Sequence, residues 1–82
     1  MRHDYRKMKI WNDSVTFAVL VYKNTKSFPH EEMYGLTSQL RRASVSVPSN
    51  IAEGSKRTTE KDFRSFLATA LGSCAEIETQ LY

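Results

Sequence analysis

The sequence predicts an all-α protein, an antiparallel up-and-down bundle of three helices in which residues 1–82 form a single domain. Three observations support this fold class. Apolar residues recur at helical spacing in three stretches, proline or glycine lies between the stretches, and the sequence contains no internal repeat or flexible linker. A chain of 82 residues also has room for only one domain, and its 40% hydrophobic and 26% charged residues are typical of a globular protein.

The first helix is expected near residues 9–26, where apolar side chains recur at i, i+4, i+7 and i+11, with Val19 beside them. The run Val19–Tyr22 is also compatible with a strand, but the length of the periodic pattern favours a helix. Phe28–Pro29 ends this helix, because proline moves the preceding residue out of the helical region. The stripe expected in the core comprises Trp11, Val15, Ala18 and Tyr22.

The second helix is expected near residues 29–54, since proline is well suited to the first helical position and Gly54 to the end. Pro48 removes one backbone donor and crowds the carbonyl of Ser44, so a kink is expected there. The core stripe comprises Met33, Leu36, Leu40, Ala43 and Val47.

The third helix is expected near residues 59–81. Thr59–Asp62 resembles a capping box with aspartate in place of glutamate, just before an apolar run. Small residues beside the stripe would let another helix approach closely, and Cys74 is expected to be buried as a small apolar residue. The stripe comprises Phe63, Phe66, Leu67, Ala70, Cys74, Ile77 and Leu81.

The net charge of +3 is uneven: the N-terminal end and the middle of the chain are basic, and the last segment is acidic. This asymmetry fits attraction to phosphate, or complementary packing between segments and subunits. Arginine suits phosphate because its planar guanidinium donates two hydrogen bonds at once. The candidate nucleic-acid-binding residues are Arg2, Arg6, Lys7, Lys9, Arg41, Arg42 and Arg57.

The residues of a catalytic or metal centre do not come together in this sequence. His3 and His30 have no second ligand at helical spacing, and three scattered glycines form no phosphate-binding loop. We therefore expect neither enzymatic activity nor a metal or cofactor. The longest apolar run is Phe17–Tyr22, too short for a membrane span, and the lone Cys74 fits a reducing compartment, so a cytoplasmic protein is expected.

Residues 36–54, LTSQLRRASVSVPSNIAEG, form the most unusual part of the chain. Together with Trp11, Phe28–Pro29 and the third-helix residues up to Leu81, this stretch resembles a bacterial family of small four-helix-bundle proteins. Members of that family are encoded by intervening sequences inside large-subunit ribosomal RNA genes. The likeness extends over nearly the whole chain from Lys9 onward.

The resemblance implies properties beyond the residue pattern. The family usually has a fourth helix, so we expect that helix to be missing or truncated here. Relatives form pentamers, which implies a homo-oligomer. A similar bundle is the accessory protein of diversity-generating retroelements, where it works with a reverse transcriptase and nucleic acid.

The leading hypothesis is a non-enzymatic, oligomeric protein that binds nucleic acid, with RNA favoured. An alternative is a protein-interaction or assembly module without a nucleic-acid ligand, and a helix-turn-helix DNA binder ranks last because the third helix is apolar and acidic. Part of the middle motif also fits a purely structural role, in which Asn50 and Glu53 form a hydrogen-bonded network with Arg41 and Arg42 that locks the kink at Pro48. Glu53 by itself is expected to be a structural ion-pair member, with Arg41, Arg42 or Arg57 as its partner. The residues of this structural motif are Ser46, Pro48, Asn50, Glu53 and Gly54.

Overall fold

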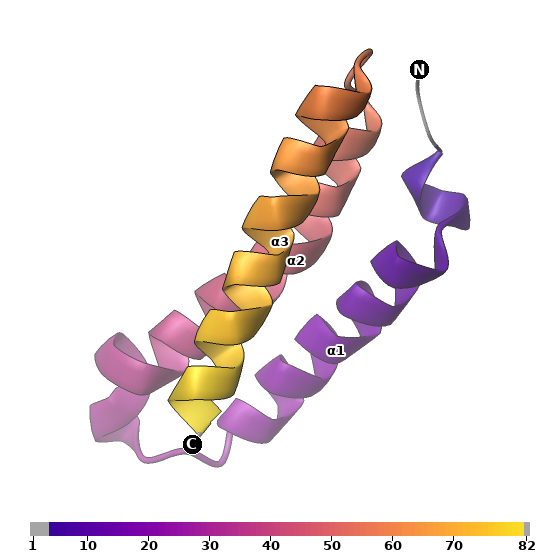
Figure 1. Cartoon of the computed structure of the whole chain (residues 1–82). Coiled ribbons are helices and arrows are strands. Elements are labelled where there is room, and N and C mark those ends of the chain that lie inside the picture. Colours follow the sequence, from indigo (N-terminus) through magenta and orange to yellow (C-terminus); the bar gives the residue numbers. More distant parts are fainter. Residues whose placement is uncertain (1–3, 82) are drawn as a thin grey trace.

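The computed structural model describes residues 4–81, which form three long helices and no strand (Figure 1). The helices are α1 (Lys9–Thr25), α2 (Ser38–Ser55) and α3 (Glu60–Leu81). They run alternately down, up and down, so the predicted antiparallel all-α bundle is confirmed. Two 3₁₀ turns, η1 (Tyr5–Lys7) and η2 (His30–Glu32), and the wide turn η3 (Met33–Thr37) complete the elements.

Helix α2 is the central element of the bundle. Helix α3 packs along α2, and α1 packs against α2 while diverging from α3 toward the end where the N-terminus lies (Figure 1). Most of the buried core residues come from α2 and α3, and side chains of α1 and the first connection cover them from one side. The buried core cluster comprises Leu40, Ala43, Val47, Ile51, Ala70 and Ile77.

The first helix ends one residue before its predicted end, but its buried face is rotated from the predicted stripe. Tyr22 and Val19 are 42% and 48% exposed, whereas Ala18 and Thr25 are buried. The face toward α2 follows alternating steps of three and four residues through Trp11, Ser14, Ala18, Val21 and Thr25. Two of these residues are hydroxylic, which is why a count of apolar residues alone gave the wrong face.

The prediction of one helix over 29–54 is wrong at its N-terminal end. Pro29 has an extended conformation, η2 and η3 follow it, and α2 begins only at Ser38. Within η3, Gly35 has φ −110° and ψ −108°, which lie outside the helical region. Glycine is a poor helix former because it loses much backbone freedom on folding, so the chain breaks at this residue. Met33, which was expected in the core, is exposed as a result.

The remainder of α2 continues through Pro48, which is buried, and ends at Ser55, one residue after the expected stop. The fully buried Ser44 hydroxyl donates to the carbonyl oxygen of Arg41 at 2.9 Å, so it does not compensate for the missing donor of Pro48. The kink expected at Pro48 stays a prediction.

Helix α3 starts as predicted, because the backbone N–H of Asp62 donates to the hydroxyl of Thr59 at 3.2 Å. Phe63, Ala70 and Ile77 are buried, as expected. The expectation for Cys74 is wrong, since this residue is exposed. The adjacent Ser73 takes the inward position instead, because its hydroxyl pairs with a hydroxyl on α2.

Candidate nucleic-acid interface

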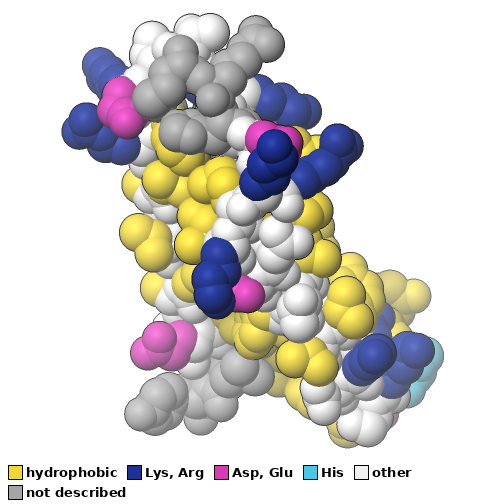
Figure 2. Space-filling model, turned by 90° about the vertical axis from the view of Figure 1, so that its right-hand side faces the viewer, with side chains coloured by type: hydrophobic (Ala, Val, Ile, Leu, Met, Phe, Trp, Pro, Cys, Tyr) yellow, Lys and Arg dark blue, Asp and Glu magenta, His cyan; other side chains and the backbone are white. Residues whose placement is uncertain are grey.

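The predicted basic residues fall into two groups at opposite ends of the molecule. Arg6, Lys7 and Lys9 lie near the start of α1, at the same end as Arg57, which follows α2 (Figure 1). Arg41 and Arg42 lie in the first turns of α2, near the other end of a molecule 45 Å long. The face drawn in Figure 2 likewise shows basic side chains mostly toward the two ends, with apolar surface between them. Arg2 lies outside the described residues.

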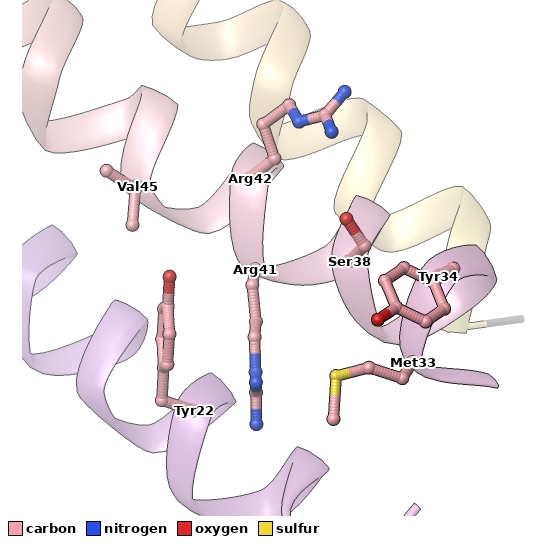
Figure 3. A pocket seen from close by; sticks show the side chains of 7 residues that line it. All are labelled: Tyr22, Met33, Tyr34, Ser38, Arg41, Arg42 and Val45. Atoms are coloured by element: carbon pink, nitrogen blue, oxygen red, sulfur yellow. The ribbon is translucent and has the colours of Figure 1, made fainter. Parts of the chain in front are cut away.

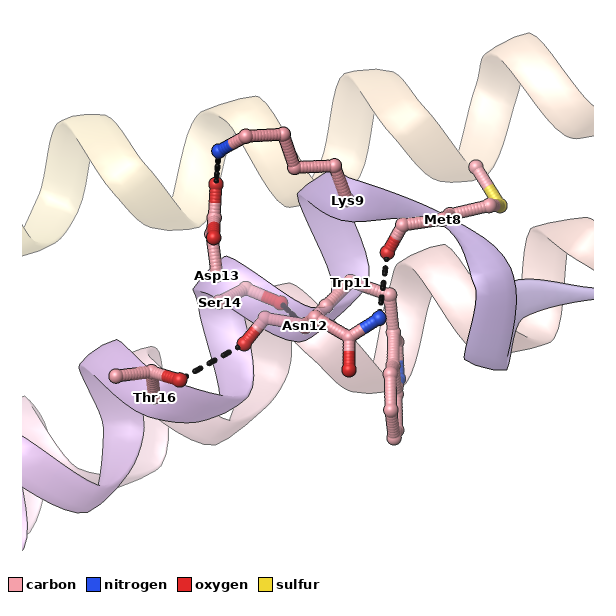
Figure 4. A network of polar contacts seen from close by, with 7 residues as sticks. All are labelled: Met8, Lys9, Trp11, Asn12, Asp13, Ser14 and Thr16. Atoms are coloured by element: carbon pink, nitrogen blue, oxygen red, sulfur yellow. Dashed lines mark hydrogen bonds and ion pairs between the residues drawn. The ribbon is translucent and has the colours of Figure 1, made fainter.

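At the N-terminal end, local hydrogen bonds order the start of α1 (Figure 4). The Asn12 amide nitrogen donates to the carbonyl oxygens of Arg6 and Met8, both at 3.0 Å. Lys9 donates a hydrogen bond to Asp13 at 2.6 Å. This hydrogen bond is the main cause that raises the pKa of Lys9, and the negative charge of the Asp13 carboxylate is the second. Lys9 therefore has its own counter-ion. Arg6 and Lys7 are also exposed, and no described carboxylate lies within ion-pair distance of either.

Arg57 also has partners within the chain. Its guanidinium lies 3.3 Å from the carboxylate of Glu53 and 4.7 Å from the ring centre of Phe66. Glu53 was expected to form hydrogen bonds inside the protein, but it is exposed. Of the three arginines expected as its ion-pair partners, it pairs with Arg57, one helical turn away. The expected network that joins Glu53 to Arg41 and Arg42 is therefore wrong.

Asn50 is hydrogen-bonded inside the protein, as expected, but its partner is Ser46 and not Arg41 or Arg42. Its amide nitrogen donates to the carbonyl oxygen of Ser46 at 2.8 Å and to the Ser46 hydroxyl at 3.0 Å. The Ser46 and Ser73 hydroxyls are hydrogen-bonded at 2.8 Å, and Ser73 donates to the carbonyl oxygen of Thr69 at 3.3 Å. This chain of hydrogen bonds joins α2 to α3 beside Pro48, which lies between Ser46 and Asn50, so the polar part of the motif contributes to the helix interface.

Asn50→Ala should therefore lower the free energy of unfolding by about 1–3 kcal/mol, because it leaves the hydroxyl and the carbonyl oxygen of the half-buried Ser46 with fewer partners. Glu53→Ala is the matched control on the same helix, and its exposed ion pair should contribute about 1 kcal/mol or less. Urea denaturation followed by circular dichroism measures both values. Equal losses for the two variants would contradict the assignment of Asn50 to the helix interface.

Arg41 has a different environment from the other cations. Its Nε donates to the hydroxyl of the buried Thr25 at 2.9 Å, and its guanidinium lies 4.8 Å from the ring centre of Tyr22. The Thr25 hydroxyl in turn donates to the carbonyl oxygen of Val21 at 2.8 Å. A neutral hydroxyl and an aromatic face thus fix the orientation of Arg41 without cancelling its charge.

A shallow cavity of about 510 Å³ opens beside Arg41 (Figure 3). Tyr22 and Arg41 lie stacked on one side of it, Met33 and Tyr34 lie on the other, and Ser38 lies between them. The guanidinium of Arg42 points away from Arg41 at the rim. The lining side chains are Tyr22, Met33, Tyr34, Ser38, Arg41, Arg42 and Val45.

The aromatic part of this cavity was missed by the sequence reasoning. Tyr22 was assigned to the core because its spacing matched the stripe, and Tyr34 was counted within the second helix. Tyr34 is 93% exposed because the break at Gly35 places it on a turn. The sequence offered one signal for this cavity, which is that Tyr22 and Thr25 lie three residues apart and therefore on one face of α1. That both contact Arg41 could be seen only once α1 and α2 were packed together.

Within residues 4–81, no group of three or more histidine, cysteine, aspartate or glutamate side chains could hold a metal ion. Among the same residues, no helix is long and apolar enough to span a membrane. The fold and surface define a small antiparallel helical-bundle protein with basic ends and an arginine–tyrosine cavity.

The chain belongs to the 23S rRNA-intervening sequence protein family, whose model matches residues 6–82. This match agrees with the family resemblance seen in the middle motif. No curated protein matches the chain.

Proposed function

We propose that the chain is a cytoplasmic, non-enzymatic and oligomeric bundle protein that binds nucleic acid, with RNA favoured over DNA. The observation that carries this proposal is the uncompensated charge of Arg41 and Arg42. Among the described residues, no carboxylate lies within ion-pair distance of either guanidinium, whereas Lys9 and Arg57 each have one. Cationic groups without an internal counter-ion are available to phosphate.

The distribution of charge supports a polyanion rather than a small anion. Arg6 and Lys7 add a second exposed basic group at the other end of the 45 Å molecule. A nucleic-acid strand places phosphates at regular intervals and can contact both groups, whereas a small anion contacts one. Single-stranded regions of RNA also offer unstacked bases, which suit the tyrosines near Arg41 better than a closed duplex does.

The oligomeric part of the proposal rests on an apolar groove between α1 and α3. This groove has a volume of about 530 Å³, and its rim includes Leu71, which is 71% exposed. A second copy of the chain is the proposed occupant, because α3 carries four acidic and two basic residues while the start of α1 is basic. The family resemblance supports a ring of five copies. The groove is lined by Ile10, Asp13, Ser14, Phe17, Val47, Ile51, Leu67, Ala70, Leu71 and Cys74.

Binding of a labelled single-stranded RNA should weaken linearly in log affinity against log salt, as measured by fluorescence anisotropy from ~50 to ~200 mM salt. Lys7→Gln and Arg42→Gln should each reduce the slope by about 0.7, the value for one phosphate contact to a single strand. Arg64→Gln, which removes an exposed arginine from the acidic helix α3, is the charge-matched control and should leave the slope unchanged.

Two results would contradict the proposal: no binding at the lowest salt, or affinity that does not change with salt. Single-stranded DNA of the same sequence and duplex DNA serve as comparison ligands, and tighter binding to either would overturn the preference for RNA.

The second candidate is a protein-interaction module, which the same apolar groove favours. Apolar surface of this kind on α1 and α3 is typical of a helix-binding face. In that case the chain would associate with itself or another protein while no RNA is bound at low salt, so the anisotropy titration separates the two candidates.

A further inference from the structure

We infer that the cavity beside Arg41 is a subsite for one unpaired nucleotide, with its phosphate on Arg41 and its base against Tyr34. The inference rests on the proposed RNA binding and adds a specific site to it. The ligand class is therefore a nucleotide within a single strand, whose phosphate and base are recognised by different side chains of one cavity.

The phosphate position follows from the geometry of Arg41. Thr25 occupies the Nε hydrogen, and within the described residues no acceptor lies within hydrogen-bond distance of the two terminal nitrogens. Stacking on Tyr22 and the bond to Thr25 fix the plane of the guanidinium before a ligand arrives. An orientation set in advance reduces the side-chain entropy lost on binding, and the free edge can donate two parallel hydrogen bonds to a phosphate.

The base position follows from Tyr34. This ring is 93% exposed, lies on η3 outside the helical core, and faces the same cavity as Arg41 (Figure 3). Met33 lies beside it and offers a polarisable apolar surface. Every nucleobase has a flat π-face, so an exposed tyrosine next to a phosphate site matches a base with little sequence preference.

The cavity chemistry favours a nucleotide over an acidic peptide. Its lining is mostly apolar and aromatic, and its volume of about 510 Å³ falls in the range of roughly 300–1,000 Å³ typical of small-ligand pockets. An acidic side chain would satisfy Arg41 but leave the aromatic surface unused. A paired base is excluded because its faces are already stacked within the duplex, so the base must be extruded or single-stranded.

The test compares two labelled octanucleotides, an oligouridylate and an abasic ribose-phosphate strand of the same length. The wild-type chain should bind the oligouridylate roughly tenfold more tightly, the effect expected from stacking of about one base. Tyr34→Ala should abolish this difference while leaving the salt slope unchanged, because Tyr34 carries no charge. Tyr34→Phe keeps the aromatic face and should retain the preference.

A second variant distinguishes the contribution of the planar, two-bond guanidinium of Arg41 from the contribution of its charge. Arg41→Lys keeps the positive charge but loses the planar fork, so affinity for both strands should fall while the preference for bases is retained. Circular dichroism confirms folding of each variant, and Tyr34 is exposed enough that its replacement leaves the core intact.

The outcomes distinguish this inference from the proposed function. A base preference that survives in Tyr34→Ala would overturn the subsite and leave RNA binding intact. Failure of the wild-type chain to bind either strand at low salt would overturn both. Binding of a polyglutamate peptide in preference to RNA, with loss in Arg41→Lys, would overturn the nucleotide site in favour of an acidic protein partner.

Discussion

Replacing Gly54 with alanine is expected to destabilise the bundle by about 1–3 kcal/mol, although alanine normally favours a helix. A Cβ at this position would lie 2.7 Å from the Cβ of Phe66 and 3.1 Å from Cδ1 of Phe63. The Phe66 atom is attached directly to the backbone of α3 and cannot rotate away. The added methyl group must therefore push α3 from α2, along the most extensive contact in the molecule.

Gly72 provides a matched control for this variant. It lies on α3, and a Cβ added there would meet no atom within 4 Å. Gly72→Ala should stabilise the protein by about 0.5–1 kcal/mol, because only the helix preference changes. Urea denaturation measures both variants, and the same sign for the two substitutions would contradict close packing at Gly54.

Introducing a charge at Leu71 is expected to dissociate the proposed oligomer. Leu71 lies on the apolar groove and is 71% exposed in the single chain, so Leu71→Asp should leave the fold unchanged. In an assembly that covers the groove, the carboxylate would be buried without a partner, at a cost of about 3–5 kcal/mol per interface. The dissociation constant should therefore rise by at least about 100-fold.

Sedimentation over a range of concentrations tests this expectation. The wild-type chain should be a concentration-dependent oligomer, and Leu71→Asp a monomer of 9.4 kDa. Thr69→Asp adds the same charge on the opposite side of α3, outside the groove, and should remain oligomeric. A wild-type monomer that is stable on dilution would show that no second copy covers the groove.

The sequence predicted the helices well where periodicity and turn residues agreed. Periodicity and Phe28–Pro29 placed the end of α1 within one residue, and Thr59 placed the start of α3. The break before α2 was missed because Met33, Leu36 and Leu40 continue the helical spacing across Gly35. The spacing of apolar residues does not report the backbone conformation of a single glycine, so the turn at Gly35 was visible only in the structure.

The candidate site was less predictable, for a physical reason. Charge in the sequence identified Arg41 and Arg42, and the spacing of four residues allowed a pair between Glu53 and Arg57. The sequence could not show that Arg41 binds the Thr25 hydroxyl and not a carboxylate. The environment of Arg41 depends on which faces of α1 and α2 meet. Asn50 could be assigned to a hydrogen-bond network because its partner is one helical turn away. Tyr22 and Tyr34, in contrast, line one cavity with Arg41 only because α1 and η3 lie beside α2.

The exposed thiol of Cys74 has a practical consequence for the groove between α1 and α3. Cys74 is the single cysteine of the chain, and it lines this groove without being buried in it. The rate at which a maleimide alkylates the natural sulfur atom therefore reports how often the groove is open to solvent. If Cys74 becomes more protected from alkylation as the protein concentration rises, the change measures how much of the groove is occupied by other copies of the chain. No cysteine has to be introduced into the sequence for this measurement.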